Sequence, residues 1–127
     1  MKLSRIAALA LASACLSFAQ PAIPQNDRPI RIQNLYWAKP GKGDEVYRWR
    51  LHASDVRVRL GLARGRVLRR QGESEGLPDV IWQCDYPDAE ARSKDVAVTT
   101  ASPEFKQVQE HMDTLIRRFD RLVLADR

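Results

Sequence analysis

Polar and aromatic side chains alternate along two segments of the chain in a pattern that could line a pocket for a small organic molecule. Asn34 and Tyr36 lie two residues apart in one segment, and Trp82, Cys84 and Tyr86 repeat this spacing in another. Because successive side chains of a strand point to opposite sides of a sheet, residues two apart share one face. Aromatic walls with a few polar groups suit a flat hydrophobic ligand. We therefore take these five residues as candidate ligand-binding residues.

A helix predicted between the two segments contributes three further candidates. His52 lies at the edge of the apolar stripe of this helix, where its imidazole could act as a general base. Alternatively, His52 is a boundary residue that bonds to water or to Asp55. Trp49 lies within the stripe and could pack in the core or face a ligand. Arg50, repeated one heptad later as Arg57, could hold a ligand carboxylate or form salt bridges across a dimer.

Other kinds of chemistry have less support. Cys84 is most simply a small buried hydrophobe, since no feature places a base beside it to activate a nucleophile. His52 and His111 are far apart in the chain, without clustered cysteines or paired acids at ligand spacing, so no metal site is expected. We expect no cofactor.

The elements that position these residues can be predicted from apolar spacing, turn residues and helix caps. Asp44 and Ser102 are expected N-caps, and the apolar spacing of the last helix continues to Phe119. Strands are expected over 30–39, 65–71, 79–86 and 122–125, with helices over 44–60, after Asp88 and after Ser102. This order predicts an α+β fold of the ferredoxin-like βαββαβ plan, a four-stranded antiparallel sheet with its helices on one face.

The first strand carries apolar side chains on both faces. Ile32 and Tyr36 lie on one side, and Leu35 and Trp37 lie on the other. The helices can cover only one face of such a sheet, so the other needs cover that one chain does not provide. We expect a homodimer, formed through the second sheet face into an α/β barrel.

The beginning of the chain has the composition of a removable targeting segment. Basic residues precede a run of apolar and small residues that is shorter than the roughly 20 needed to span a bilayer. We expect export to the periplasm or the medium after cleavage behind Ala19. The alternative is lipidation of Cys15, which would anchor the domain to a membrane. The expected parts are a signal peptide over 1–19, a flexible leader over 20–28 and one domain over 29–127.

Removing the signal peptide lowers the formal net charge from +5 to +3. Arginine clusters around Arg66 and Arg118 would suggest nucleic acid in a cytosolic protein. An exported protein rarely meets nucleic acid, so we expect no such partner, and solvated strand edges and a helix end explain the clusters. Loss of Cys15 also leaves Cys84 without an intrachain disulfide partner.

Three stretches resemble a known superfamily: YWAKPGKGDEVYRWR, PDVIWQCDYPDAEAR and ASPEFKQVQEHMDTLIRRF. They look like the dimeric α/β-barrel superfamily, which includes antibiotic-biosynthesis monooxygenase, NIPSNAP-like and EthD-like domains. The resemblance implies the fold and the homodimer. It leaves the activity open, because the superfamily includes cofactor-free oxygenases, heme-degrading enzymes, isomerases and proteins without known activity.

Heme-degrading members resemble the chain at Asn34, but they also use a His on the last helix and a Trp just before it. Those places fall here on Gln109 and near Thr99, and His111 lies on a different helix face. The favoured hypothesis is therefore an exported dimer that binds a small hydrophobic or aromatic molecule, with cofactor-independent monooxygenase-like activity as an extension. A non-enzymatic envelope scaffold or stress-response protein is the alternative. Two further hypotheses are heme binding or heme degradation, and the binding of nucleic acid or another anionic surface through the arginine-rich strand.

Overall fold

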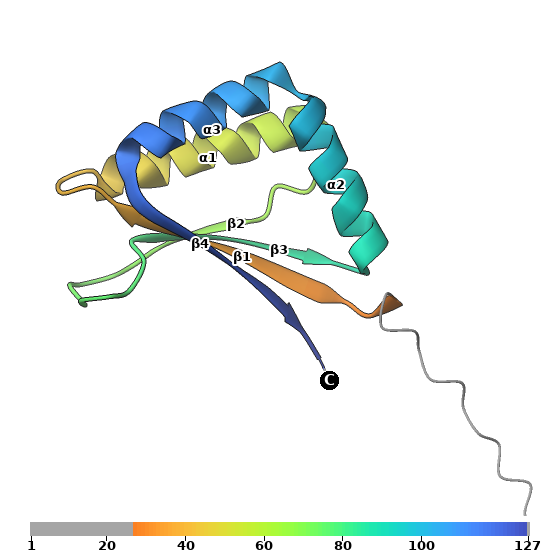
Figure 1. Ribbon diagram of the computed structural model, residues 1–127, viewed down its shortest axis with the longest axis horizontal. Helices are drawn as coiled ribbons and strands as arrows, with labels where there is room; N and C mark the ends of the chain where they lie inside the picture. The colour runs from red at the N-terminus through yellow and green to blue at the C-terminus, as the bar shows by residue number, and fades with distance from the viewer. Residues whose placement is uncertain (1–26, 127) are drawn as a thin grey trace, which may run out of the picture.

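The computed structural model describes residues 27–126, in which one antiparallel sheet carries all of its helices on one side (Figure 1). The strand and helix order confirms the predicted ferredoxin-like plan. The predicted signal peptide and its predicted cleavage site, Cys15 and most of the predicted leader lie outside the described residues. The elements are β1 (Ile30–Ala38), α1 (Gly43–Arg59), β2 (Arg66–Arg69), β3 (Val80–Tyr86), α2 (Ala89–Ala101), α3 (Pro103–Leu115) and β4 (Ile116–Ala125).

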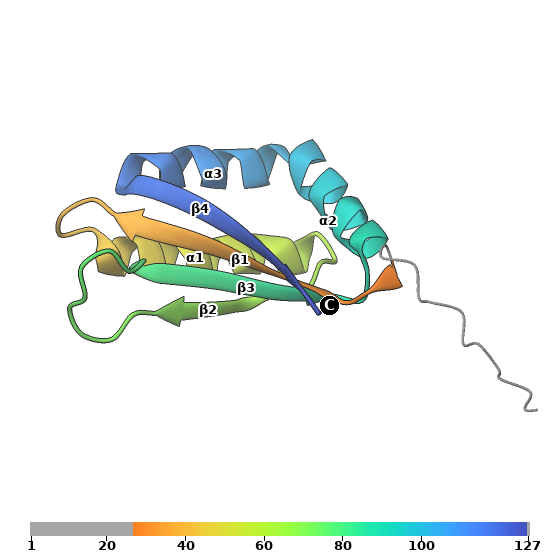
Figure 2. The ribbon, with the colours of Figure 1, turned by 60° about the horizontal axis from the view of Figure 1, so that its bottom comes forward.

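The strands lie in the order β2-β3-β1-β4, so β1 is central and β4 forms one edge (Figure 2). Asn34 in β1 pairs with Trp82 in β3 on one side and with Arg121 in β4 on the other. Tyr36 likewise pairs with Phe119 of β4. The register therefore brings polar and aromatic side chains from three strands onto one face, as the two-residue spacing predicted for β1 and β3.

The core lies between this face and the helices. Trp82 and Tyr36 of the sheet are buried against Val46 of α1 and Met112 of α3. α1 and α3 pack on each other through a second cluster, and the indole Nε1 of Trp49 donates a 2.9 Å hydrogen bond to the carbonyl of Val108. The side chains of Asp88 and Ser102 cap α2 and α3, and each accepts a hydrogen bond from the backbone N–H of the residue three positions later.

The boundary between α3 and β4 differs from the prediction. α3 ends at Leu115, and β4 takes in Phe119, which the apolar spacing had assigned to the helix. The reason is tertiary: β1 needs a pairing partner along its whole length, and Phe119 packs edge-on against Tyr36 with ring centroids 5.3 Å apart. The last strand is therefore ten residues long and not the short segment expected at 122–125.

The start of α1 differs by a small shift. Lys42 occupies the N-cap position without a side-chain cap bond, and Asp44, the expected cap, lies in the first turn. The turn just before it uses Gly41 at a positive φ of 75°, which allows the helix to begin at Gly43. The carboxylate of Asp44 still lies near the positive end of the helix dipole. Among residues 27–126, no helix combines the length and the apolar character needed to cross a membrane.

Candidate functional site

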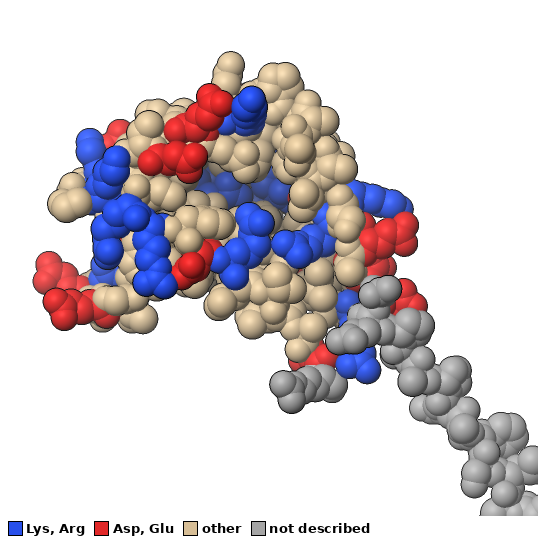
Figure 3. Space-filling model, in the orientation of Figure 1, with Lys and Arg blue, Asp and Glu red and all other residues tan. Residues whose placement is uncertain are grey.

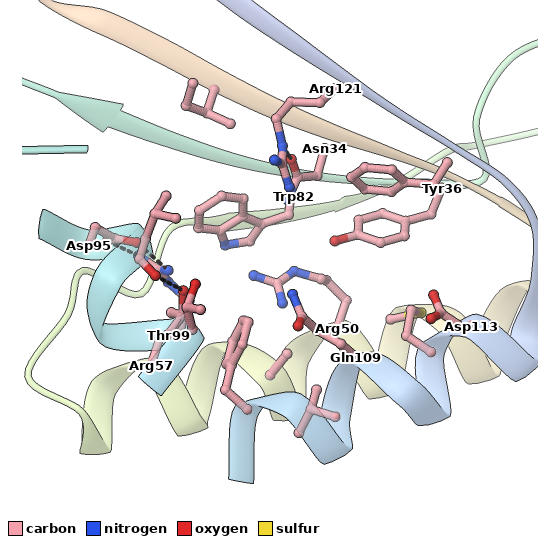
Figure 4. A pocket seen from close by; sticks show the side chains of 18 of the residues that line it. Asn34, Tyr36, Arg50, Arg57, Trp82, Asp95, Thr99, Gln109, Asp113 and Arg121 are labelled. Carbon is pink, nitrogen blue, oxygen red and sulfur yellow. Dashed lines mark hydrogen bonds and ion pairs between the residues drawn. The ribbon is translucent and has the colours of Figure 1, made fainter. Parts of the chain in front are cut away.

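A cavity of about 490 Å³ lies between the sheet and the helices (Figure 4). Its walls come from β1, β3 and β4 on one side and from all three helices on the other. Figure 3 shows Lys and Arg atoms in and around a hollow between the helical layer and the sheet. The lining combines aromatic rings with polar and charged groups, chiefly Asn34, Tyr36, Arg50, Arg57, Trp82, Tyr86, Asp95, Thr99, Phe105, Gln109, Asp113, Phe119 and Arg121.

Trp82 is the fixed aromatic surface of this cavity. Its indole Nε1 donates a 3.1 Å hydrogen bond to the carbonyl of Arg64, which holds the ring in place. The guanidinium carbons of Arg50 and Arg57 each lie 4.7 Å from the centroid of the ring. Both distances are within the range of a cation–π interaction. One indole therefore supports two arginines of α1 that lie one heptad apart.

Each of the three guanidinium nitrogens of Arg57 donates a hydrogen bond within the chain. Two of its nitrogens donate to the carboxylate of Asp95 at 2.9 and 2.5 Å, and Nε donates to the carbonyl of Ala63 at 2.8 Å. Burial acts against the charge, but the hydrogen bonds and negative charge of Asp95 raise the pKa of Arg57 overall. Arg64 also pairs within the chain, with Asp55 at 2.5 Å. These two arginines therefore do not require salt bridges across a dimer.

Arg50 lacks such a partner. Its side chain is only 4% exposed, and its Nε is buried without a hydrogen-bond partner. No carboxylate of residues 27–126 forms an ion pair with its guanidinium. Burial lowers the pKa of Arg50, and the charge of Arg57 lowers it further, although a guanidinium stays protonated at neutral pH. Figure 4 shows the guanidinium in the middle of the cavity, between Trp82 and Gln109.

Asn34 and Arg121 form the polar part of the sheet wall. Nε of Arg121 donates a 2.8 Å hydrogen bond to Oδ1 of Asn34 across the β1–β4 ladder. Tyr36 and Phe119 lie two pairs further along the same ladder, on the same face of the sheet, and supply aromatic surface. A flat molecule in the cavity would therefore meet rings at the sheet and polar groups at both walls.

No protein-family model matches the chain, and no curated protein matches it. Solved structures do match. A dimeric protein of unknown function with a ferredoxin-like fold from Bacteroides fragilis superposes with a TM-score of 0.59 at 10% identity, covering 77% of this chain and 96% of that one. This chain has a ferredoxin-like fold.

Two other solved structures that are similar to this chain come from the groups that its sequence resembles. A NIPSNAP family protein from Agrobacterium tumefaciens superposes with a TM-score of 0.58 at 14% identity, covering 79% of this chain and 87% of that one. A candidate antibiotic biosynthesis monooxygenase from Bacteroides thetaiotaomicron gives 0.54 at 16% identity, covering 79% and 90%. At these identities the likeness concerns the fold alone.

The ferredoxin-like fold brings five of the eight predicted site residues to the cavity and leaves three outside its lining. The five are Asn34, Tyr36, Arg50, Trp82 and Tyr86. Cys84 lies on the same face of β3 but is buried in the core, where burial raises the pKa of its thiol and favours the protonated form.

Trp49 and His52 lie at the outer side of the α1–α3 contact. The ring of Trp49 packs between those of His52 and His111, with centroids 4.8 and 4.2 Å away. His52 therefore does not border the cavity as a general base would need to, and Asp55, its suggested partner, pairs with Arg64. Helical spacing placed His52 at the edge of the apolar stripe but did not determine which neighbour lies over that edge.

Several lining residues were not predicted as site residues. Asp95 and Thr99 come from α2, and Gln109 and Asp113 come from α3 at the four-residue spacing that places side chains on one helix face. The stripe that contains Phe105 could have suggested that face. Arg121 could be found only from the β1–β4 register, because that register places it opposite Asn34.

Proposed function

We propose that this protein binds a small, flat organic molecule in the cavity between its sheet and its helices. The observation that carries the proposal is a space of about 490 Å³ bordered by the rings of Tyr36, Trp82, Phe105 and Phe119. This volume lies within the range of roughly 300–1,000 Å³ that is typical of small-molecule sites. The polar groups between the rings would fix the orientation of the ligand.

The open cavity also bears on the alternative of a non-enzymatic envelope scaffold. A scaffold would be favoured if the large aromatic side chains filled the space between sheet and helices. Trp49 instead packs at the outer side of α1, and Trp82 lies against the cavity wall, so space remains. The arrangement therefore supports the binding function over the scaffold.

A cofactor-independent monooxygenase-like reaction is the activity that we propose to test first. One solved neighbour is described as a candidate antibiotic biosynthesis monooxygenase. Such a reaction needs a site that excludes water and orients an electron-rich organic substrate. The aromatic lining of the cavity and its position beneath α2 and α3 fit that requirement.

The binding proposal can be tested with the mature protein and a panel of naphthols, quinols and heme. Tryptophan fluorescence reports on the site, because Trp82 is the one tryptophan among the lining residues. Thr99→Phe would fill the cavity, whereas Val98→Phe changes the neighbouring exposed position of α2. We expect at least one flat compound to quench fluorescence and raise the melting temperature in the wild type and in Val98→Phe but not in Thr99→Phe. No response to any compound would refute the proposal.

We also propose that two copies associate through the sheet face that the helices leave open. Leu68, Leu122 and Leu124 lie on that face and are 38%, 42% and 43% exposed. Exposed apolar patches of this kind mark association surfaces. The Bacteroides fragilis neighbour is described as dimeric.

Export remains a proposal that rests on the N-terminal sequence. Expression of the full chain in a Gram-negative host, followed by intact mass measurement of the periplasmic product, tests it. A chain that begins at Gln20 supports cleavage after Ala19, and a lipid-modified chain that begins at Cys15 supports anchoring. A full-length chain in the cytoplasm contradicts both.

A further inference from the structure

The cavity contains a buried cation that the protein itself does not neutralise. Arg50 is 4% exposed, its Nε has no hydrogen-bond partner, and its guanidinium lies between Trp82 and Gln109 (Figure 4). Burying a charge without a partner is unfavourable, so such groups are normally paired. We infer that the molecule bound in this cavity carries a carboxylate or another anionic oxygen group that pairs with Arg50. The inference rests on the proposed binding function and names the class of its ligand.

Arg57 provides an internal comparison for Arg50. Both arginines project from α1, and both guanidinium carbons lie 4.7 Å from the centroid of the Trp82 ring. Arg57 has the carboxylate of Asp95 as a two-pronged partner and the carbonyl of Ala63 as a third acceptor. The fold thus supplies an acceptor to every guanidinium nitrogen of Arg57 and leaves Arg50 facing the cavity without a counter-charge. The planar fork of a guanidinium matches a carboxylate with two parallel hydrogen bonds.

The other charged groups of the lining favour the same sign of ligand. The charges of Arg57 and Asp95 offset each other at hydrogen-bond distance. Arg50, Arg92 and Arg121 then remain against the single carboxylate of Asp113. A cavity with this balance attracts an anion and disfavours a cation. Aromatic walls beside the buried guanidinium therefore point to an aromatic or otherwise flat carboxylate.

Two probes of matched shape separate the charge from the ring. 2-Naphthoate and 2-naphthamide have the same ring system, but only the first carries a negative charge. Titration of the mature protein, followed by tryptophan fluorescence and calorimetry, should give an affinity for 2-naphthoate that is at least about tenfold higher, as expected for a charge-assisted hydrogen-bonded pair. Arg50→Met should remove this preference, and Arg50→Lys should keep part of it. Arg48→Met, an exposed arginine of the same helix, should leave it unchanged.

Stability provides a second, independent readout. Removing an unpaired buried charge in favour of an apolar side chain of similar length relieves a desolvation penalty. Arg50→Met should therefore melt at the same or a higher temperature than the wild type without ligand. A lower melting temperature together with an unchanged preference would assign Arg50 to the core and overturn the inference. If Arg50→Met does not fold, the ratio of the two affinities is measured in Arg50→Lys. A smaller preference for 2-naphthoate than in the wild type supports the inference, and an unchanged preference overturns it.

The outcomes separate the two proposals. Equal affinities for the two probes in the wild type would leave the binding function standing and overturn the anionic ligand. A preference for 2-naphthoate that persists in folded Arg50→Met would also overturn it. Absence of binding by both probes and by the panel of naphthols, quinols and heme would remove the binding function, and the inference with it.

Discussion

Arg57 of α1 and Asp95 of α2 form a buried, two-pronged ion pair, with side chains only 3% and 9% exposed. Asp95 is the one buried residue of α2, and apolar side chains of this helix such as Val96 are exposed. The ion pair therefore helps to hold α2 against α1, a role that buried apolar side chains usually have. Because α2 also supplies Thr99 to the cavity, the same contact helps to define the site.

Breaking this pair from one side should be costly. Asp95→Asn leaves the guanidinium of Arg57 buried without a counter-charge, and such changes typically lower the free energy of unfolding by about 3–5 kcal/mol. Chemical denaturation measures the loss. Asp55→Asn is the control, because its pair with Arg64 is half exposed and should contribute less than about 1 kcal/mol. Similar losses in the two variants would contradict a special role for the buried pair.

Gly65 is expected to be irreplaceable for two separable reasons. Its φ is 71°, and a Cβ at this position would overlap Nε1 of Trp82. Gly61 has a similar φ of 77° but has nothing within 4 Å of its Cβ position. Gly61→Ala should therefore cost only the left-handed backbone, about 1–2 kcal/mol, whereas Gly65→Ala should cost more and move the indole. Denaturation and the tryptophan emission maximum of the two variants test this difference.

Alkaline pH should destabilise the fold through Cys84 and Tyr86. Burial raises the pKa of both groups, so the folded state holds their protons more tightly than the unfolded chain does. The stability that these groups contribute is complete below their unfolded pKa values, about 8.5 and 10, and is lost as the pH rises through the higher folded values. The denaturant concentration at the unfolding midpoint should therefore decrease as the pH is raised from about 8 to about 11, roughly the window set by those values. The decline should be shallower in Tyr86→Phe; an equal decline would exclude this residue as a source.

The predictions from sequence succeeded where one local rule decides. Asn34 and Tyr36 share a face because strand side chains alternate, and neighbouring residues do not alter that. Phe119 shows the limit: it continues the four-residue spacing of a helix, yet it pairs with Tyr36 because β1 requires a partner strand. The surroundings of His52 could not be predicted for a related reason, since its helix position does not reveal that the Trp49 ring packs between it and His111.

Arg50 was predicted as a candidate, but its most informative property could not be read from the sequence. Its spacing from Arg57 placed both on one side of α1. The presence of Asp95 beside one arginine and not the other depends on where α2 packs. The pairing of Arg121 with Asn34 likewise depends on register between segments far apart in the chain. Local patterns therefore predicted the walls of the cavity better than its electrostatics.

The proposed dimer can be disrupted on the open face of the sheet. Leu122 pairs with Gln33 on that face and is 42% exposed in the single chain. Leu122→Glu would place a charge inside the interface, where burial without a partner opposes association. We expect wild type to elute as a dimer and Leu122→Glu as a folded monomer in size-exclusion chromatography with light scattering. Val58→Glu changes an exposed apolar residue of α1, on the helical side, and should remain dimeric. A monomeric wild type, or a dimer in both variants, would show that this face is not the interface.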